Sequence, residues 1–221
     1  MELVIPVAYK STNSAIEASF WLRELPPLIA LDFETAPKWS DEDKAIIEAS
    51  IPTLPTFEER RQALQRIAST GLSHPSLTRL THMSLATSDR DAMVFIIDNI
   101  QLERFLMNWL VTTPIKQIWH NASFDFKLIY YRTGKFPLSY EDSQQYAKTI
   151  INHTDVFKAR TGLKELMGHR YGAWGITEDH FNISQIYEPK VLLYAATDAC
   201  ATYALYTGME ASHGQTTPIS L

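Results

Sequence analysis

Three short patterns of acidic residues carry groups able to do chemistry, and the first lies at the end of a predicted strand. Residues 28–33 form an apolar run bounded by Pro26-Pro27, which is typical of a central strand with apolar side chains on both faces. Asp32 and Glu34 close this run, and because strand side chains alternate, the two carboxylates point to the same side. Buried like charges repel and lose their hydration, so such a pair is unusual. The structural alternative is that the strand has ended and water solvates both acids.

The second pattern, Asn121 and Asp125, directly follows a predicted strand over 115–120. Asp125 falls in the first turn of a predicted helix over 123–133. A side chain at such a junction can converge with others at the ends of neighbouring elements. A plain strand-to-helix junction, with Asn121 or Ser123 as the helix cap, explains the same residues without any chemistry.

The third pattern is Tyr194 and Asp198, four residues apart on a long helix predicted from Pro189 to about residue 211. This spacing places both side chains on one face of the helix. The residues around them are small, which lets a helix pack closely on a sheet and carry Asp198 toward it: Ala195, Ala196, Ala199 and Ala201. The alternative is a surface aspartate beside a half-buried tyrosine.

Together the three patterns predict a metal-dependent phosphodiesterase. Four carboxylates at one point carry a charge of about −4, which is unfavourable unless cations offset it. Two divalent ions would balance it, and hard oxygen ligands select Mg²⁺ or Mn²⁺. Ions roughly 4 Å apart can activate a water as nucleophile and stabilise the leaving 3′ oxygen. The un-ionised hydroxyl of Tyr194 can orient this water by hydrogen bonding.

The order of these motifs resembles the three motifs of the DEDD 3′→5′ exonucleases. Tyrosine four residues before the last aspartate is similar to the tyrosine subclass, because position 193, where the histidine subclass has its histidine, is Leu193. The segments 29–35, 162–166 and 194–199 also resemble the proofreading domain of family A (polymerase I-like) DNA polymerases. The similarity spans about residues 28–210, nearly the whole chain.

This resemblance implies an α/β, RNase H-like fold with a mixed five-stranded sheet flanked by helices. It implies that Asp32, Glu34 and Asp198 hold the first metal ion, while Asp32 and Asp125 serve the second. It also implies that Tyr194 positions the attacking water.

Substrate contacts are implied for a second group of residues. Asn121 is expected to touch the terminal nucleotide or its sugar, and Thr35 lies where the family contacts the 3′ end. The family has a leucine wedge shortly after the first motif, where this chain has Trp39, a residue able to stack on a base. His120 and Arg160 are further candidates for substrate contact, with packing for His120 and a solvated surface for Arg160 as the alternatives.

The remaining patterns predict a single domain over 1–221. Residues 36–79 form an excursion from the core that is longer than expected for the family, and 212–221 read as a loose tail. The other predicted elements are a helix over 13–25, a hairpin of strands 80–87 and 92–98, and helices over 102–111, about 140–151 and 162–171.

Composition excludes several other classes of protein. The net charge of −5 argues against a tight nonspecific binder of duplex DNA, which is usually basic. The one cysteine, Cys200, excludes an internal disulfide and a cysteine-rich zinc site, which fits a reducing compartment, and we expect a cytoplasmic protein. No apolar run is long enough to span a membrane, so we expect no membrane partner.

The sequence therefore predicts a two-metal 3′→5′ exonuclease, with single-stranded or frayed DNA as the first expected substrate and a role in DNA replication or repair. Because 221 residues leave no room for a polymerase module, three expectations stay open: a stand-alone enzyme, a partner of a separate DNA polymerase, or an excised domain. An RNA 3′-end exonuclease resembling RNase D is the first alternative, since the same acids would serve it. The second alternative is a non-catalytic nucleic-acid-binding module.

Overall fold

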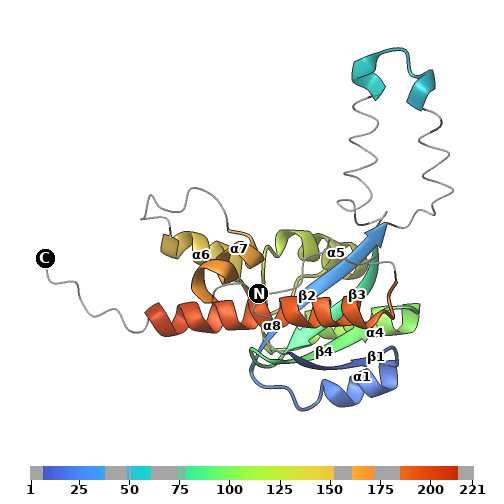
Figure 1. The fold of residues 1–221 in the computed structure, drawn as a ribbon. Coiled ribbons are helices and arrows are strands. Elements are labelled where there is room, and N and C mark those ends of the chain that lie inside the picture. Colours follow the sequence, from blue (N-terminus) through green and yellow to red (C-terminus); the bar gives the residue numbers. More distant parts are fainter. Residues whose placement is uncertain are drawn as a thin grey trace, which may run out of the picture.

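A mixed sheet of six strands forms the centre of the computed structural model (Figure 1), which describes residues 7–37, 49, 51–60, 75, 78–151, 161–171 and 185–213. The strand order is β1-β4-β3-β2-β5-β6. The pairs β1–β4, β2–β5 and β5–β6 are parallel, whereas β2–β3 and β3–β4 are antiparallel. The strands are β1 Ala8–Thr12, β2 Leu28–Pro37, β3 Thr78–Ala86, β4 Asp91–Ile96, β5 Lys116–Trp119 and β6 Tyr140–Asp142.

Helices cover both faces of this sheet. They are α1 Ala15–Trp21, α4 Ile100–Thr112, α5 Ser123–Thr133, α6 Ser143–Ile151, α7 Leu163–Tyr171 and α8 Pro189–His213, with a short 3₁₀ helix η1 at Ile51–Thr53. Helices α1, α4 and α5 pack on the face that buries Ile29, Leu31 and Phe33. Helix α8 crosses the opposite face (Figure 1), where Ala30 and its neighbours meet the alanines of that helix. No helix in the described part of the chain is long and apolar enough to cross a bilayer.

The expected α/β, RNase H-like architecture is confirmed, but the sheet has six strands rather than five. The sequence did not predict β1, because the strand is short, polar and largely exposed at the edge of the sheet. It also assigned residues 140–151 wholly to a helix. Tyr140–Asp142 instead pair with β5, and Asp142 caps the helix that follows.

Strand β2 continues to Pro37 instead of ending at residue 33, because β3 pairs with it along this whole length. Asp32 and Glu34 therefore lie within a paired strand and not at its end, which excludes the alternative of two acids solvated beyond the strand. The ladder shifts register between Glu34 and Thr35. Such an irregularity bends a strand locally.

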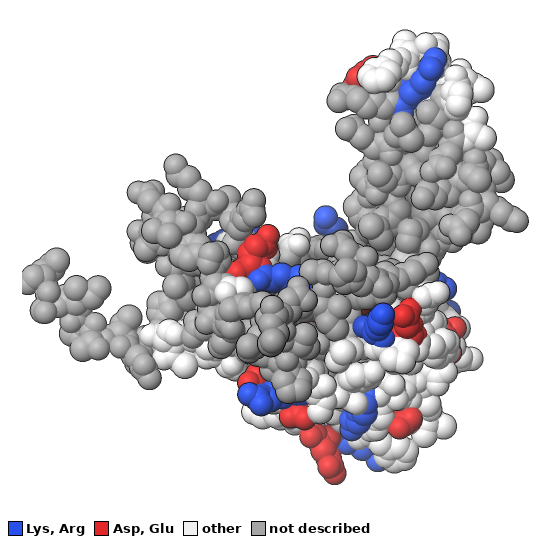
Figure 2. Space-filling model, in the orientation of Figure 1, with Lys and Arg blue, Asp and Glu red and all other residues white. Residues whose placement is uncertain are grey.

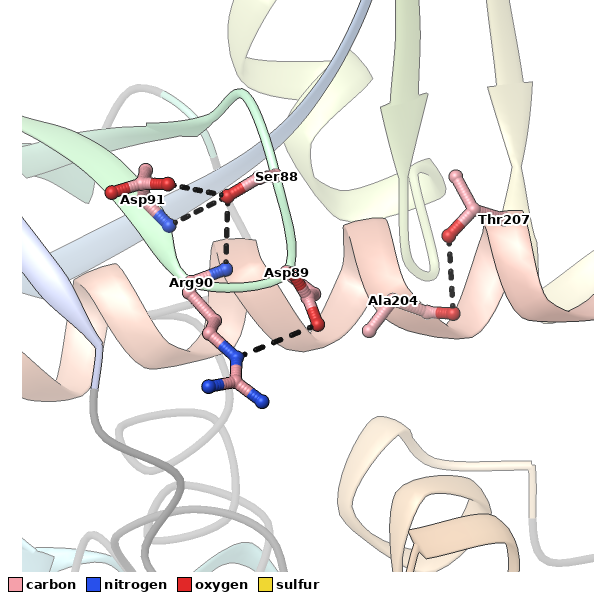
Figure 3. A network of polar contacts seen from close by, with 6 residues as sticks. All are labelled: Ser88, Asp89, Arg90, Asp91, Ala204 and Thr207. Atoms are coloured by element: carbon pink, nitrogen blue, oxygen red, sulfur yellow. Dashed lines mark hydrogen bonds and ion pairs between the residues drawn. The ribbon is translucent and has the colours of Figure 1, made fainter.

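The predicted hairpin is confirmed, and its turn explains two aspartates as structural (Figure 3). The Ser88 hydroxyl accepts hydrogen bonds from the backbone N–H groups of Arg90 and Asp91, at 3.1 and 2.9 Å, and donates to the Asp91 carboxylate at 2.8 Å. Asp89 forms an exposed ion pair with Arg90 at 3.8 Å. The contacts of Asp89 and Asp91 thus lie within the turn itself, and the Ser88 hydroxyl that binds Asp91 also caps the backbone N–H groups.

The structure also gives different bounds for other predicted segments. The predicted helix 13–25 is shorter, Ala15–Trp21, and it buries Ala18 and the following Leu22 while Ile16 and Phe20 are 73% and 57% exposed. The excursion predicted over 36–79 connects the paired ends of β2 and β3, and 38–48, 50, 61–74, 76 and 77 lie outside the described residues. Of the predicted tail over 212–221, residues 212 and 213 belong to α8, and 214–221 lie outside the described residues.

Two glycines offer a matched test of this backbone. Gly134 closes α5 in the left-handed conformation, with φ of 70°, and a Cβ at this position would meet no atom within 4 Å. We expect Gly134→Ala to lower the free energy of unfolding by about 1 kcal/mol, because only the backbone conformation is penalised. Gly168→Ala, within α7 and equally open, should raise it by roughly 0.5 kcal/mol. Urea unfolding measures both, and changes of the same sign would contradict the assignment.

Candidate active site

Three acidic side chains distant in sequence meet at one point beside β2. Asp32 and Glu34 come from β2 and Asp198 comes from α8, and one carboxylate oxygen of each lies within 4.8 Å of the other two. Glu34 and Asp198 are only 7% and 8% exposed, whereas Asp32 is half-buried. The fold thus joins the first and third sequence patterns in a single cluster that can present oxygen ligands to one cation.

Small residues on α8 bring Asp198 to this point. Ala195, Ala196 and Ala199 have no exposed surface and pack on the sheet face that also carries Ala30. Because these side chains are short, the helix backbone approaches β2 closely enough for Asp198 to reach the acids on that strand. The alternative of a surface aspartate is excluded, as Asp198 is buried.

Asp125 is the fourth acid and reaches the neighbourhood from the first turn of α5. It is 6% exposed, and its charge acts on Asp32, although it is not one of the three residues whose oxygens share the 4.8 Å cluster. The arrangement therefore has three carboxylates in one group and a fourth close enough for its charge to act on Asp32, and the division of these acids between two metal ions stays a prediction.

Burial and mutual repulsion make this acidic group unfavourable on its own. Burial raises the pKa of Asp32 well above its usual range, and the charges of Glu34, Asp198 and Asp125 raise it further. Burial raises the pKa of Asp125 to about 8, and the charge of Asp142 adds to the rise. Carboxylates held together against such a penalty are suited to a divalent cation, since its charge reverses the penalty. Hard oxygen donors fit Mg²⁺ or Mn²⁺.

A fifth acidic residue, Asp142, fixes the turn between β5 and α5. Its carboxylate accepts hydrogen bonds from the backbone N–H groups of Asn121, Ala122 and Gln144, at 3.1, 3.0 and 2.8 Å. Asn121 has φ of 59°, in the left-handed region that asparagine adopts more readily than most residues other than glycine, and the hydrogen bonds that Asp142 accepts from the N–H groups of Asn121 and Ala122 support this turn. The expected cap from Asn121 or Ser123 is wrong, because Ala122 occupies the cap position without a side-chain bond. Asp142 fell in the first turn of the predicted helix over about 140–151, so an acidic residue near a helix start was the available signal for it.

Lys164 on α7 contacts the third pattern. Its ammonium donates a hydrogen bond to the Tyr194 hydroxyl at 3.0 Å and lies 3.8 Å from the Asp198 carboxylate. It also stands 4.4 Å from the centre of the Tyr194 ring, as in a cation–π contact. Tyr194 is 3% exposed. Sequence reasoning included Lys164 in a segment resembling the family and gave it no role.

The structure places the expected substrate contacts unequally. His120 is half-buried, and its two ring nitrogens contact the Ser143 hydroxyl at 2.9 Å and the Thr161 carbonyl at 3.0 Å, which favours the packing alternative. Asn121 is exposed and Thr35 is partly exposed beside Glu34 on β2, so both stay predictions.

Trp39 and Arg160 lie outside the described residues, and their expected contacts also stay predictions.

A scan against protein-family models and a search of curated proteins find no match. Solved structures do match. NrnC from Brucella melitensis is 19% identical with a TM-score of 0.60, over 97% of this chain and 85% of that one. RNase D from Trypanosoma brucei, in complex with GMP, is 13% identical with a TM-score of 0.61, over 96% of this chain and 59% of that one. RNase D from Escherichia coli, described as an exoribonuclease, is 15% identical with a TM-score of 0.53, over 95% and 47%.

These neighbours confirm the RNase H-like exonuclease fold of the chain. NrnC has also been solved with bound Mg²⁺ and with bound pGG. None of the three proteins is a polymerase domain. The comparisons therefore support the resemblance at the level of the exonuclease fold and do not support the finer likeness to family A proofreading domains.

The raised pKa values predict how pH affects stability in the absence of metal. The carboxyl of Asp125 keeps its proton up to about pH 8 when folded, whereas it ionises near pH 4 when unfolded. The folded state then binds more protons between these limits, so the free energy of unfolding should fall as pH rises from about 4 to about 8. Thermal unfolding in EDTA measures this, and Mg²⁺ at pH 8 should restore stability.

Asp125→Asn should make the pH dependence shallower without abolishing it, because Asp32 also has a raised pKa, while Asp89→Asn, at an exposed turn, should leave it as in the unsubstituted chain. A profile in EDTA that is flat before any substitution, together with no stabilisation by Mg²⁺, would remove these acids from a metal site.

Proposed function

We propose that the chain is a metal-dependent 3′→5′ exonuclease that removes nucleotides one at a time from single-stranded nucleic acid. The observation that carries this proposal is the cluster of carboxylate oxygens from Asp32, Glu34 and Asp198 within 4.8 Å, with Asp125 close enough to act on Asp32. The fold shared with NrnC and RNase D supports it. The 3′→5′ direction rests on the resemblance to the DEDD exonucleases.

The four acids have separate roles in this proposal. Asp32, Glu34 and Asp198 would hold one divalent ion, and Asp32 and Asp125 would serve a second. When bound, such ions polarise the phosphate and lower the pKa of a coordinated water. The protein contributes by fixing the carboxylates on β2, α5 and α8 before substrate binds, so that little reorganisation accompanies the reaction.

Tyr194 and Lys164 would orient the attacking water. An ammonium group only donates hydrogen bonds, so the Tyr194 oxygen accepts the bond from Lys164 and keeps its own proton for a second partner. In the substrate complex we assign that partner to the attacking water. Lys164 then acts as a positioning residue, because it limits the directions in which the phenol can donate.

We propose RNA as the substrate, in place of the DNA that the sequence favoured. Two of the three reported neighbours are RNase D proteins, and none points to a polymerase partner or to replication and repair. Parallel digestion of matched 5′-labelled RNA and DNA oligonucleotides decides between them. Faster cleavage of the DNA strand would contradict the RNA proposal and favour the proofreading hypothesis instead.

The alternative from another class is a non-catalytic module that binds nucleic acid with the same fold. The chain has Tyr194 and all four acids. Three of these acids are less than 10% exposed: Glu34, Asp125 and Asp198. Nothing in simple binding calls for this arrangement, since it repels a phosphate backbone. Failure of the purified chain to cleave either strand with Mg²⁺ or Mn²⁺ would favour the module.

Asp32→Ala tests the metal site directly. We expect Mg²⁺-dependent cleavage to fall to background while the circular dichroism spectrum is retained, because removing one of several repelling buried acids does not break the fold. Asp89→Ala, which removes an exposed aspartate from the β3–β4 turn, is the matched control and should cleave normally. Undiminished cleavage by Asp32→Ala would take Asp32 out of the mechanism.

A double-mutant cycle tests the coupling of Lys164 to Tyr194. Tyr194→Phe should lower kcat by about a hundredfold with metal binding retained, within the range for groups that position or transfer protons. Lys164→Met should lower kcat by roughly tenfold alone and by less than about twofold when Tyr194 is already Phe. Lys148→Met, on α6, is the control lysine. Equal losses from Lys164→Met in both backgrounds would show that Lys164 does not act through Tyr194.

A further inference from the structure

A second concave site lies between α4 and α5, away from the acidic cluster. Its cavity of about 580 Å³ is lined by α4, by the end of α5 with the turn that follows, and by the start of β3. Both helices pack on the sheet face that buries Ile29 and Leu31, whereas the acidic cluster faces α8. The volume is in the range of sites that hold small ligands. None of the four proposed catalytic acids lines it.

The lining of this cavity is strongly basic. It includes Arg79, Arg104, Arg132 and Lys135, against Glu103 as the one carboxylate. Glu103 is already paired with Arg132, whose Nε lies 2.7 Å from its carboxylate oxygen. Three cations are therefore left without an acidic partner in the cavity. This is notable in a chain whose net charge is −5.

The three cationic side chains without an acidic partner in the cavity are exposed, and they line the same cavity. In the part of the chain that the structure describes, the side chains of Arg79, Arg104 and Lys135 make no hydrogen bond or ion pair, and all three residues are exposed. Arg132 is held in place by Glu103 and by the Thr78 carbonyl, to which its guanidinium donates at 3.1 Å. In Figure 2, by contrast, acidic and basic side chains are interspersed over the described surface of the face shown.

The remaining lining suggests what accompanies the anion. Tyr131 is 53% exposed, and the Arg132 guanidinium lies 5.3 Å from the centre of its ring, so an aromatic ring and a guanidinium stand together at the edge of the cavity. Ile100 and Met107 add apolar lining. Arginine forks match the geometry of phosphate oxygens, and an aromatic ring beside them suits a base. A ligand that combines a phosphate with a flat ring is a nucleotide.

We propose that this cavity is a second binding site for a nucleotide phosphate, separate from the catalytic cluster. The choice of a nucleotide over other polyanions rests on the proposed function. The nucleotide can be a free monophosphate, such as the exonuclease reaction releases, or one residue of a bound strand.

Binding measurements in EDTA test the site without cleavage. The full chain is titrated with GMP by calorimetry, and with a fluorescein-labelled RNA of about twelve nucleotides by anisotropy at several salt concentrations. The test variant is Arg104→Ala/Lys135→Ala, and the control is Arg23→Ala/Arg90→Ala, which removes the same charge from exposed positions outside the cavity. Among the described residues, the side chains of Arg104 and Lys135 make no hydrogen bond or ion pair, and Arg23 and Arg90 make only exposed contacts with Phe20 and Asp89, so both proteins should fold normally.

A free nucleotide and a bound RNA strand would give different results in these two measurements. If a free nucleotide occupies the cavity, the test variant should bind GMP about tenfold more weakly than the control does. If a strand occupies it, the slope of log affinity against log salt should become shallower by about 0.7 for each phosphate that the variant no longer neutralises. Equal behaviour of the two variants with both probes, or binding of neither probe by the unsubstituted chain, would overturn the proposal. Loss of cleavage with retained cavity binding would remove only the proposed function.

Discussion

Electrostatic repulsion between buried carboxylates is the constraint on which the rest of this structure depends. Asp32 and Glu34 share one face of β2, and α8 holds Asp198 beside them because its buried alanines pack closely on the sheet. A protein that stabilised only its own fold would gain by separating these charges. The chain instead uses its central strand and its longest helix to hold them together, which makes sense where cations complete the site.

The features that could be predicted from sequence are those with strong local signals. The apolar run before Asp32, the i, i+4 spacing of Tyr194 and Asp198, and the small residues around them each constrain geometry over a few positions. These local rules sufficed because each acid sits on a regular element whose orientation follows from its period. The order of the motifs predicted that the three elements carrying the acids approach one point, and the described contacts of β2, α5 and α8 agree with this prediction.

The residues that sequence reasoning missed act through contacts between elements. Asp142 binds backbone N–H groups about twenty positions earlier in the chain, and Lys164 meets Tyr194 thirty positions later. No periodicity links such residues, because the sheet and the packing of α7 on α8 set their distances. The short edge strands β1 and β6 were missed for a related reason. Their pairing partners, and not their own composition, make them strands.

The joining of β2 and β3 through the segment 38–77 has an evolutionary consequence. Pro37 and Thr78 are ladder partners, so the two ends of this segment are anchored side by side by the sheet itself. For a loop between fixed ends, the entropic cost of closure grows only slowly with length, by about 0.6 kcal/mol for each doubling. Natural variants can therefore lengthen, shorten or replace this connection while the geometry of Asp32 and Glu34 is inherited unchanged.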